Sequence, residues 1–173
     1  MKIESPGFTM DDVKAFMSTY RERERNFLAD RLQRVSDRLA AIAPQVTAQQ
    51  NEGAEWNAHE VLAHLAVVSK FYGVLVHRIA SGKLPDVNLL EAVNQRDSVG
   101  KQMAQLEPAD LLRMALADHQ RTITTLRTAD PESLRQTARV DAETTMTAEE
   151  IARLPLITHL EMHIEQLEKL LVR

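Results

Sequence analysis

The chain contains no cysteine among its 173 residues, and this absence excludes several kinds of chemistry together. Without thiols there can be no disulfide, no thiolate metal ligand and no cysteine nucleophile. Any sulfur nucleophile used in a reaction would therefore have to arrive with a cosubstrate.

Other features are also scarce. Aromatic residues make up only 4% of the chain, so the core must be built mainly from Leu, Ala, Val, Ile and Met. No apolar run reaches the length of about 18 residues that a membrane span needs, and the N-terminal stretch MKIESPGF lacks the apolar centre of a signal peptide. We therefore expect a cytoplasmic protein that does not bind membranes. No glycine-rich phosphate loop and no GxSxG motif occurs.

The charge balance is mildly acidic, with a formal net charge of -4. Proteins that bind nucleic acids usually present a basic footprint, so we expect no nucleic-acid partner. The 44% hydrophobic and 27% charged residues are an ordinary globular composition. Residues 1–173 are expected to form a single domain with a sizeable core.

Amphipathic helical patterns cover most of the chain, and convincing strand alternation is absent. The first helix is expected to begin after Thr9, where Asp12 completes a capping box, and to stop at Pro44. The run RERER at residues 21–25 is interpreted as a solvated face or as a bend near the middle of this helix.

The second helix is expected to begin after Asn57 and to end near Gly82. Glu60, three residues after Asn57, completes a second capping box, and Trp56 and Val61 are placed as a hydrophobic staple. Glu60 is therefore interpreted as a capping residue rather than as a catalytic base.

The third long helix is expected to begin at Pro108 and to be broken by Asp130-Pro131. The last helix has two alternatives around Pro155. It begins at this proline, or it begins at the capping box TAEE, residues 147–150, and is kinked at the proline.

Two segments are less regular. Residues 83–107 are interpreted as a crossover that contains a short helix, and residues 131–146 are polar and weakly patterned. The predicted fold class is all-α, a four-helix bundle with a long crossover between the second and third helices.

The six histidines are sorted by the helix face on which they fall. His64 comes three residues after Val61 and four before Val68, which places it on the apolar stripe of the second helix. His59 and His77 are separated by about five helical turns and point roughly away from His64. We expect these two to face solvent.

The segment HLEMH in the last helix contains the pair that is most typical of a metal site. His159 and His163 are four residues apart on one face, the spacing at which two imidazoles chelate one ion. If the second and fourth helices are neighbours, His64 can complete a three-histidine site for zinc, nickel, iron or copper. The alternative is that each histidine is a hydrogen-bonded core residue.

Two further residues are candidates for the surroundings of such a site. His119 faces inward and either hydrogen-bonds a ligand imidazole or packs in the core. Gln166 shares the face of His159 and His163, so it either lines the pocket or lies exposed at the helix end. A ferritin-like di-iron site is excluded because no histidine has an acidic residue three positions before it.

Two segments resemble a known family. EWNAHEVLAHL resembles the Trp-(Ser/Asn)-x-x-Glu-x-x-x-His-Leu segment of the DinB-like (YfiT-type) metal-dependent enzymes, and HLEMHIEQL resembles the HxxxH…Q segment of their last helix. Asn94, within AVNQRD, is similar to an asparagine often found in the crossover of that family. The resemblance covers nearly the whole chain.

The resemblance implies a divalent metal ion on His64, His159 and His163, with nickel or zinc expected and iron, manganese or copper as alternatives. Similar proteins include transferases and isomerases that use bacillithiol, mycothiol or glutathione, and homodimers are frequent among them. This favours a transferase that joins a low-molecular-weight thiol to a small-molecule substrate. A metal-dependent hydrolase and a non-enzymatic bundle that binds a small ligand or a partner helix are the alternatives. No residue is assigned a catalytic role.

Overall fold

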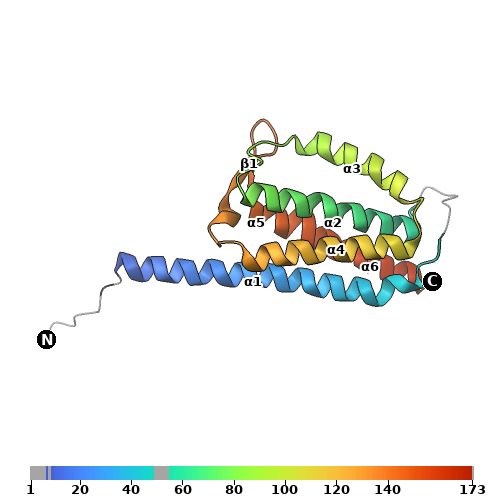
Figure 1. Ribbon diagram of the computed structural model, residues 1–173, viewed down its shortest axis with the longest axis horizontal. Coiled ribbons are helices and arrows are strands. Elements are labelled where there is room, and N and C mark those ends of the chain that lie inside the picture. Colours follow the sequence, from blue (N-terminus) through green and yellow to red (C-terminus); the bar gives the residue numbers. More distant parts are fainter. Residues whose placement is uncertain (1–6, 8, 49–54, 173) are drawn as a thin grey trace.

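The computed structural model describes residues 7, 9–48 and 55–172, which form a bundle of long helices (Figure 1). The prediction of an all-α fold is confirmed. The last helix of the bundle is made of three consecutive pieces, α5, a π-helical segment η3, and α6. The bundle helices are α1 (Met10–Ile42), α2 (Ala58–Ala80), α4 (Pro108–Thr128), and α5 (Ala148–Ile151) with η3 (Ala152–Thr158) and α6 (His159–Leu171).

The directions of the helices explain the long crossover. Contacts of His59 with Leu106 and of Ser69 with His119 show that α2 runs parallel to the segment that leads into and forms α4. A chain that leaves the end of α2 must therefore return along the bundle before α4 can begin. Residues 81–107 make this return, and their helix α3 (Leu89–Met103) packs on the outer side of α2 (Figure 1).

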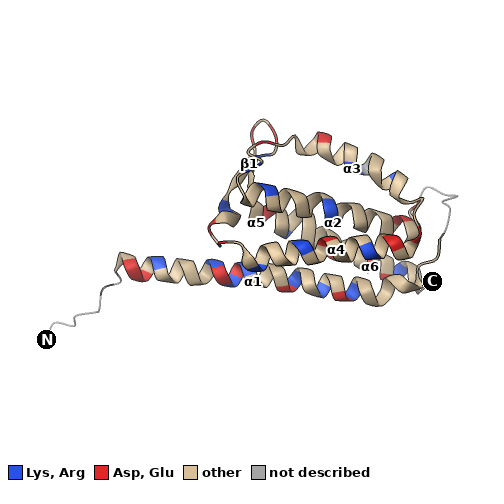
Figure 2. Cartoon of the chain, in the orientation of Figure 1, with Lys and Arg blue, Asp and Glu red and all other residues tan. Residues whose placement is uncertain are grey.

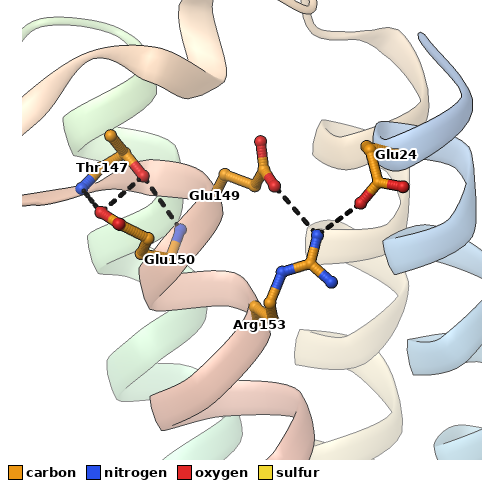
Figure 3. Close-up of polar contacts among 5 residues, drawn as sticks. All are labelled: Glu24, Thr147, Glu149, Glu150 and Arg153. Atoms are coloured by element: carbon orange, nitrogen blue, oxygen red, sulfur yellow. Dashed lines mark hydrogen bonds and ion pairs between the residues drawn. The ribbon is translucent and has the colours of Figure 1, made fainter. Parts of the chain in front are cut away.

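The predicted helix starts are confirmed by their caps. In each capping box the first side chain accepts a hydrogen bond from the third helical amide, and the third carboxylate accepts one from the capping amide. The three boxes are Thr9 with Asp12, Asn57 with Glu60, and Thr147 with Glu150, the last of which is drawn in Figure 3. At the other end of α2, Gly82 has a φ of 68°, a conformation that glycine adopts without strain.

Pro155 lies inside the last helix, which begins after Thr147, so the structure selects the second of the two alternatives. Proline has no amide hydrogen, and its ring clashes with the carbonyl of the preceding turn. The wider turns of η3 accommodate the ring, and the Thr158 hydroxyl donates to the carbonyl of Arg153 at 2.9 Å. His159 is the first residue after this segment.

Three arginine–glutamate pairs join α1 to the last helix, and their α1 members are spaced by seven residues. From one pair to the next the residue number rises on both helices, so α1 and the last helix run parallel. Arg153 also bonds Glu149 on its own helix (Figure 3). The pairs are Glu24 with Arg153 at 2.7 Å, Arg31 with Glu161 at 3.1 Å, and Arg38 with Glu168 at 3.0 Å.

The pair of Arg31 with Glu161 is expected to stabilise the fold more than the pair of Arg38 with Glu168. The Arg31 side chain is 18% exposed and also donates to the Thr158 hydroxyl at 3.2 Å, whereas the Arg38 side chain is 40% exposed. Arg31→Ala should lower the free energy of unfolding by about 1–2 kcal/mol, and Arg38→Ala by less than about 1 kcal/mol. Urea denaturation measures both. Equal losses would contradict this ranking.

The N-terminal half of α1 extends beyond the rest of the bundle (Figure 1). Apolar residues at helical spacing are exposed there, with Val13 at 41%, Phe16 at 65% and Tyr20 at 50%. The helix continues without a break through RERER, so this run contains no bend. Charges of both signs alternate along this part of α1 (Figure 2).

Two arginines of the run contact the chain that follows α4, so the run is only partly a solvated face. Arg21 pairs with Glu132, and Arg25 donates to the carbonyl of Ala129. These contacts join α1 to the end of α4.

The polar segment before the last helix forms a short hairpin that the sequence did not reveal. Strands β1 (Thr137–Arg139) and β2 (Thr145–Thr147) pair antiparallel, with Ala138 opposite Met146. Each strand has three residues, which is too short to show alternation. The Val87 amide donates to the Arg139 carbonyl at 2.8 Å, so the hairpin also holds the start of the crossover.

Helix α2 is the central helix, and residues 61–69 are all buried. By length and composition, it is the one helix in the described chain apolar enough to cross a membrane, but 78% of its apolar window is buried inside the bundle, as in a core helix. The prediction that His59 faces solvent is wrong. His59 is 4% exposed, and its Nε2 hydrogen-bonds the Leu106 carbonyl at 2.8 Å, because the end of the crossover covers the start of α2. His77 is exposed, as predicted.

Candidate metal centre

Three histidines from two helices come together at one place in the bundle. His64 lies in the first half of α2, and His159 and His163 lie in the first half of α6. One ring nitrogen of each lies within 4.8 Å of the other two. The Nε2 atoms of His64 and His159 are 3.2 Å apart. His64 is 9% exposed, and the other two are half-buried, so the cluster lies at the edge of the core.

The spacing fits a divalent ion. Zinc–nitrogen bonds of about 2.0–2.1 Å in a tetrahedral site place two ligand nitrogens about 3.3 Å apart. The 3.2 Å between the Nε2 atoms of His64 and His159 meets this requirement, and a ring nitrogen of His163 lies within 4.8 Å of both. The donors are all imidazoles, which suits zinc, nickel, copper or iron.

Gln166 lies beside the cluster as the partner of a candidate ligand. Its Oε1 is 2.8 Å from Nδ1 of His163. A carbonyl oxygen only accepts, so Nδ1 carries the proton and Nε2 of His163 keeps the lone pair that a metal needs. Gln166 is half-buried and hydrogen-bonded to His163, and its place in a pocket stays a prediction.

Removing this partner should weaken metal binding. Gln166→Ala leaves the His163 ring without the acceptor that fixes its orientation and tautomer, and we expect the metal dissociation constant to rise by about 10-fold or more. Isothermal titration with Zn²⁺ or Ni²⁺ measures the change. Glu165→Ala, at the exposed neighbouring position, is the matched control. Equal affinities of the two variants would contradict this role.

Trp56 forms one wall of the site, a role that sequence reasoning missed. Its ring lies 4.8 Å from the His64 ring and stacks on the His163 ring at 5.9 Å, with 26° between the planes of the stacked pair. Trp56 is 42% exposed, so this wall of the site reaches the protein surface. The sequence feature that could have indicated this role is the place of Trp56 in the EWNAHEVLAHL segment. Trp56 was interpreted only as part of a hydrophobic staple.

Tyr72 and Arg96 border the site on another side. The buried Tyr72 ring lies 6.4 Å from the His159 ring, and Arg96 of α3 donates to the Tyr72 hydroxyl at 3.3 Å. Burial lowers the pKa of His163, the Arg96 charge lowers it further, and the bond to Gln166 opposes both. Arg96 belongs to α3, the helix of the crossover, and the sequence does not show where this helix packs on the bundle. Asn94 on the same helix is exposed.

His119 is placed in the core. Ser69 donates its hydroxyl to the Leu65 carbonyl at 2.6 Å, so His119 donates from Nε2 to the Ser69 oxygen at 2.8 Å. Its Nδ1 is buried without a hydrogen-bond partner among the described residues. Burial lowers the pKa of His119 to about 4. Of the two alternatives, core packing is the one that these contacts support.

The fold and the site together define a helical-bundle protein with a candidate three-histidine metal centre. A profile of the DinB superfamily matches residues 9–167, and the chain belongs to this superfamily. Comparisons with curated proteins and with solved structures give no match.

Proposed function

We propose that the protein is a metal-dependent enzyme that transfers a low-molecular-weight thiol to an electrophilic small molecule. The observation that carries this proposal is the cluster of His64, His159 and His163, which is made of neutral donors and contains no carboxylate. A divalent ion on such ligands would favour the thiolate form of a thiol near pH 7. Because the chain has no cysteine, the thiol must come from a cosubstrate.

The surrounding residues support this chemistry through their contacts with the histidines. Gln166 orients His163 and leaves the Nε2 lone pair of this ring available to a metal. The Trp56 ring contacts two of the three imidazole rings. Glu60 is held in a capping box at the start of α2, so it has a structural role that does not require it to act as a base.

A fluorogenic assay tests the proposal. Metal-loaded protein is incubated with monochlorobimane and with bacillithiol, mycothiol or glutathione, and formation of the thiol conjugate is followed by fluorescence. We expect a rate above that of metal-free protein and of the His64→Ala variant. If no thiol reacts while esters or amides are hydrolysed in a metal-dependent way, the protein is a hydrolase. If neither reaction occurs, a non-enzymatic binding role is favoured.

A homodimer in the cytoplasm is part of this proposal. Support for the dimer comes from the exposed apolar side chains on the projecting half of α1, since an isolated helix with an exposed apolar stripe is marginal in water. The stripe contains Met10, Val13, Phe16 and Tyr20.

The dimer is tested by its mass in solution. Phe16→Glu together with Tyr20→Glu should convert the dimer to a monomer, because both side chains are at least half exposed in the single chain. Size-exclusion chromatography with light scattering measures the mass. Leu90→Glu, an exposed apolar position on α3, is the control and should remain dimeric. A monomeric wild-type protein would overturn the proposal.

A further inference from the structure

A cleft of about 500 Å³ lies between α2 and α3 and reaches Met114 of α4. Its walls are mainly aliphatic, aromatic and methionine side chains, including Phe71, Leu75, Val99 and Met103. This volume lies within the range of about 300–1,000 Å³ that is typical of small-molecule sites. The walls can therefore surround an apolar body of modest size.

The charged groups that border the cleft are all positive. Lys70 and Arg78 of α2 and Arg96 of α3 line it, and no acidic side chain is among its described lining residues. Neither Lys70 nor Arg78 forms an ion pair with a described residue, and both are exposed. In a chain with a net charge of -4, this local excess of positive charge favours an anion.

The cleft also adjoins the candidate metal centre. Arg96 belongs to both, because it lines the cleft and donates to the Tyr72 hydroxyl at 3.3 Å. The Tyr72 ring in turn lies 6.4 Å from the His159 ring. A molecule held beside Arg96 would thus be close to the three histidines.

We propose that this cleft binds a small amphipathic anion, an aryl or alkyl carboxylate whose apolar part lies between α2 and α3 and whose carboxylate lies among Lys70, Arg78 and Arg96. The identification of this molecule as the electrophilic substrate of the metal centre rests on the proposed function. Binding to the cleft does not.

Three compounds with one apolar body and different charges test the binding. Isothermal titration is carried out with 1-naphthaleneacetate, neutral 1-naphthaleneethanol and cationic 1-naphthaleneethylamine. We expect the carboxylate to bind at least about 10-fold more tightly than the other two, because the charge that borders the cleft attracts one and does not favour the others. Equal affinities for the three compounds would overturn the proposal.

Variants of the cleft locate the site. Arg78→Gln and Arg96→Gln should each weaken binding of 1-naphthaleneacetate by about 5-fold or more, whereas Arg113→Gln, an exposed arginine of α4 outside the cleft, should not. Val99→Trp should abolish binding by filling the cleft, and circular dichroism checks that this variant is folded. Unchanged affinity in folded Val99→Trp would overturn the proposal.

The outcomes for the cleft and for the reaction can be separated. His64 is a candidate metal ligand and does not line the cleft. The affinity of the His64→Ala variant for 1-naphthaleneacetate should therefore lie within about 2-fold of that of wild type. Selective binding without thiol transfer would support the cleft and contradict the proposed reaction. Thiol transfer without preference for the carboxylate would support the reaction and contradict the cleft.

Discussion

Replacing His64, His159 or His163 with alanine is expected to weaken binding of a divalent metal by about 100-fold or more. Structural zinc in zinc-finger peptides binds with an apparent free energy of about 10–16 kcal/mol, so by analogy the loss of one strong ligand should cost several kcal/mol. The three nitrogens lie within 4.8 Å of one another, so each variant would leave only two of the three candidate ligands. Elemental analysis of protein purified without a histidine tag, followed by competition titration, measures the effect.

The matched control for these variants is His77→Ala, because His77 lies exposed on α2 away from the cluster. It should retain the metal content and affinity of wild type. His59→Ala should also retain metal, but it removes a buried hydrogen bond to the Leu106 carbonyl and is expected to destabilise the fold by about 1–2 kcal/mol. Full metal occupancy in all three cluster variants would show that the ligand assignment is wrong.

The free energy of unfolding is expected to fall by about 3 kcal/mol between pH 6.5 and pH 4 because of His119 alone. Burial lowers its pKa from 6.5 to about 4, so in this window the unfolded chain binds a proton that the folded chain does not. Stability is therefore complete above pH 6.5 and decreases by about 1.4 kcal/mol per pH unit as the pH falls toward 4. Below pH 4 this residue causes no further loss.

The His119→Leu variant isolates this contribution from that of the carboxylates, which titrate similarly in both proteins. Ser69 keeps its hydrogen bond to the Leu65 carbonyl in the variant, and the unpartnered Nδ1 of His119 is removed. Urea denaturation of metal-free protein at pH 7, 5.5 and 4 should give a difference between wild type and variant that changes by about 3 kcal/mol. His77→Leu is the exposed control. Parallel pH curves for His119→Leu and wild type would contradict the prediction.

The sequence predicted the pair of His159 and His163, because their relative position depends only on geometry within one helix. The four-residue spacing of His159 and His163 places both imidazoles on one face of α6 whatever surrounds it. His64 joined them only under the assumption that the second and last helices are neighbours, which the structure shows. Trp56 was assigned a local role, because its contact with His163 joins segments that are far apart in sequence.

The capping boxes and the glycine that ends α2 show what the sequence by itself determined. Thr9, Asn57 and Thr147 each act within one helical turn, so their effect does not depend on the rest of the fold. The burial of His59 and the approach of Arg96 to Tyr72 were decided only by the tertiary structure. A helical wheel assigns one buried face to each helix, whereas residues 61–69 of α2 are all buried once the crossover packs against it. Contacts between segments so far apart leave no periodic signal in the sequence.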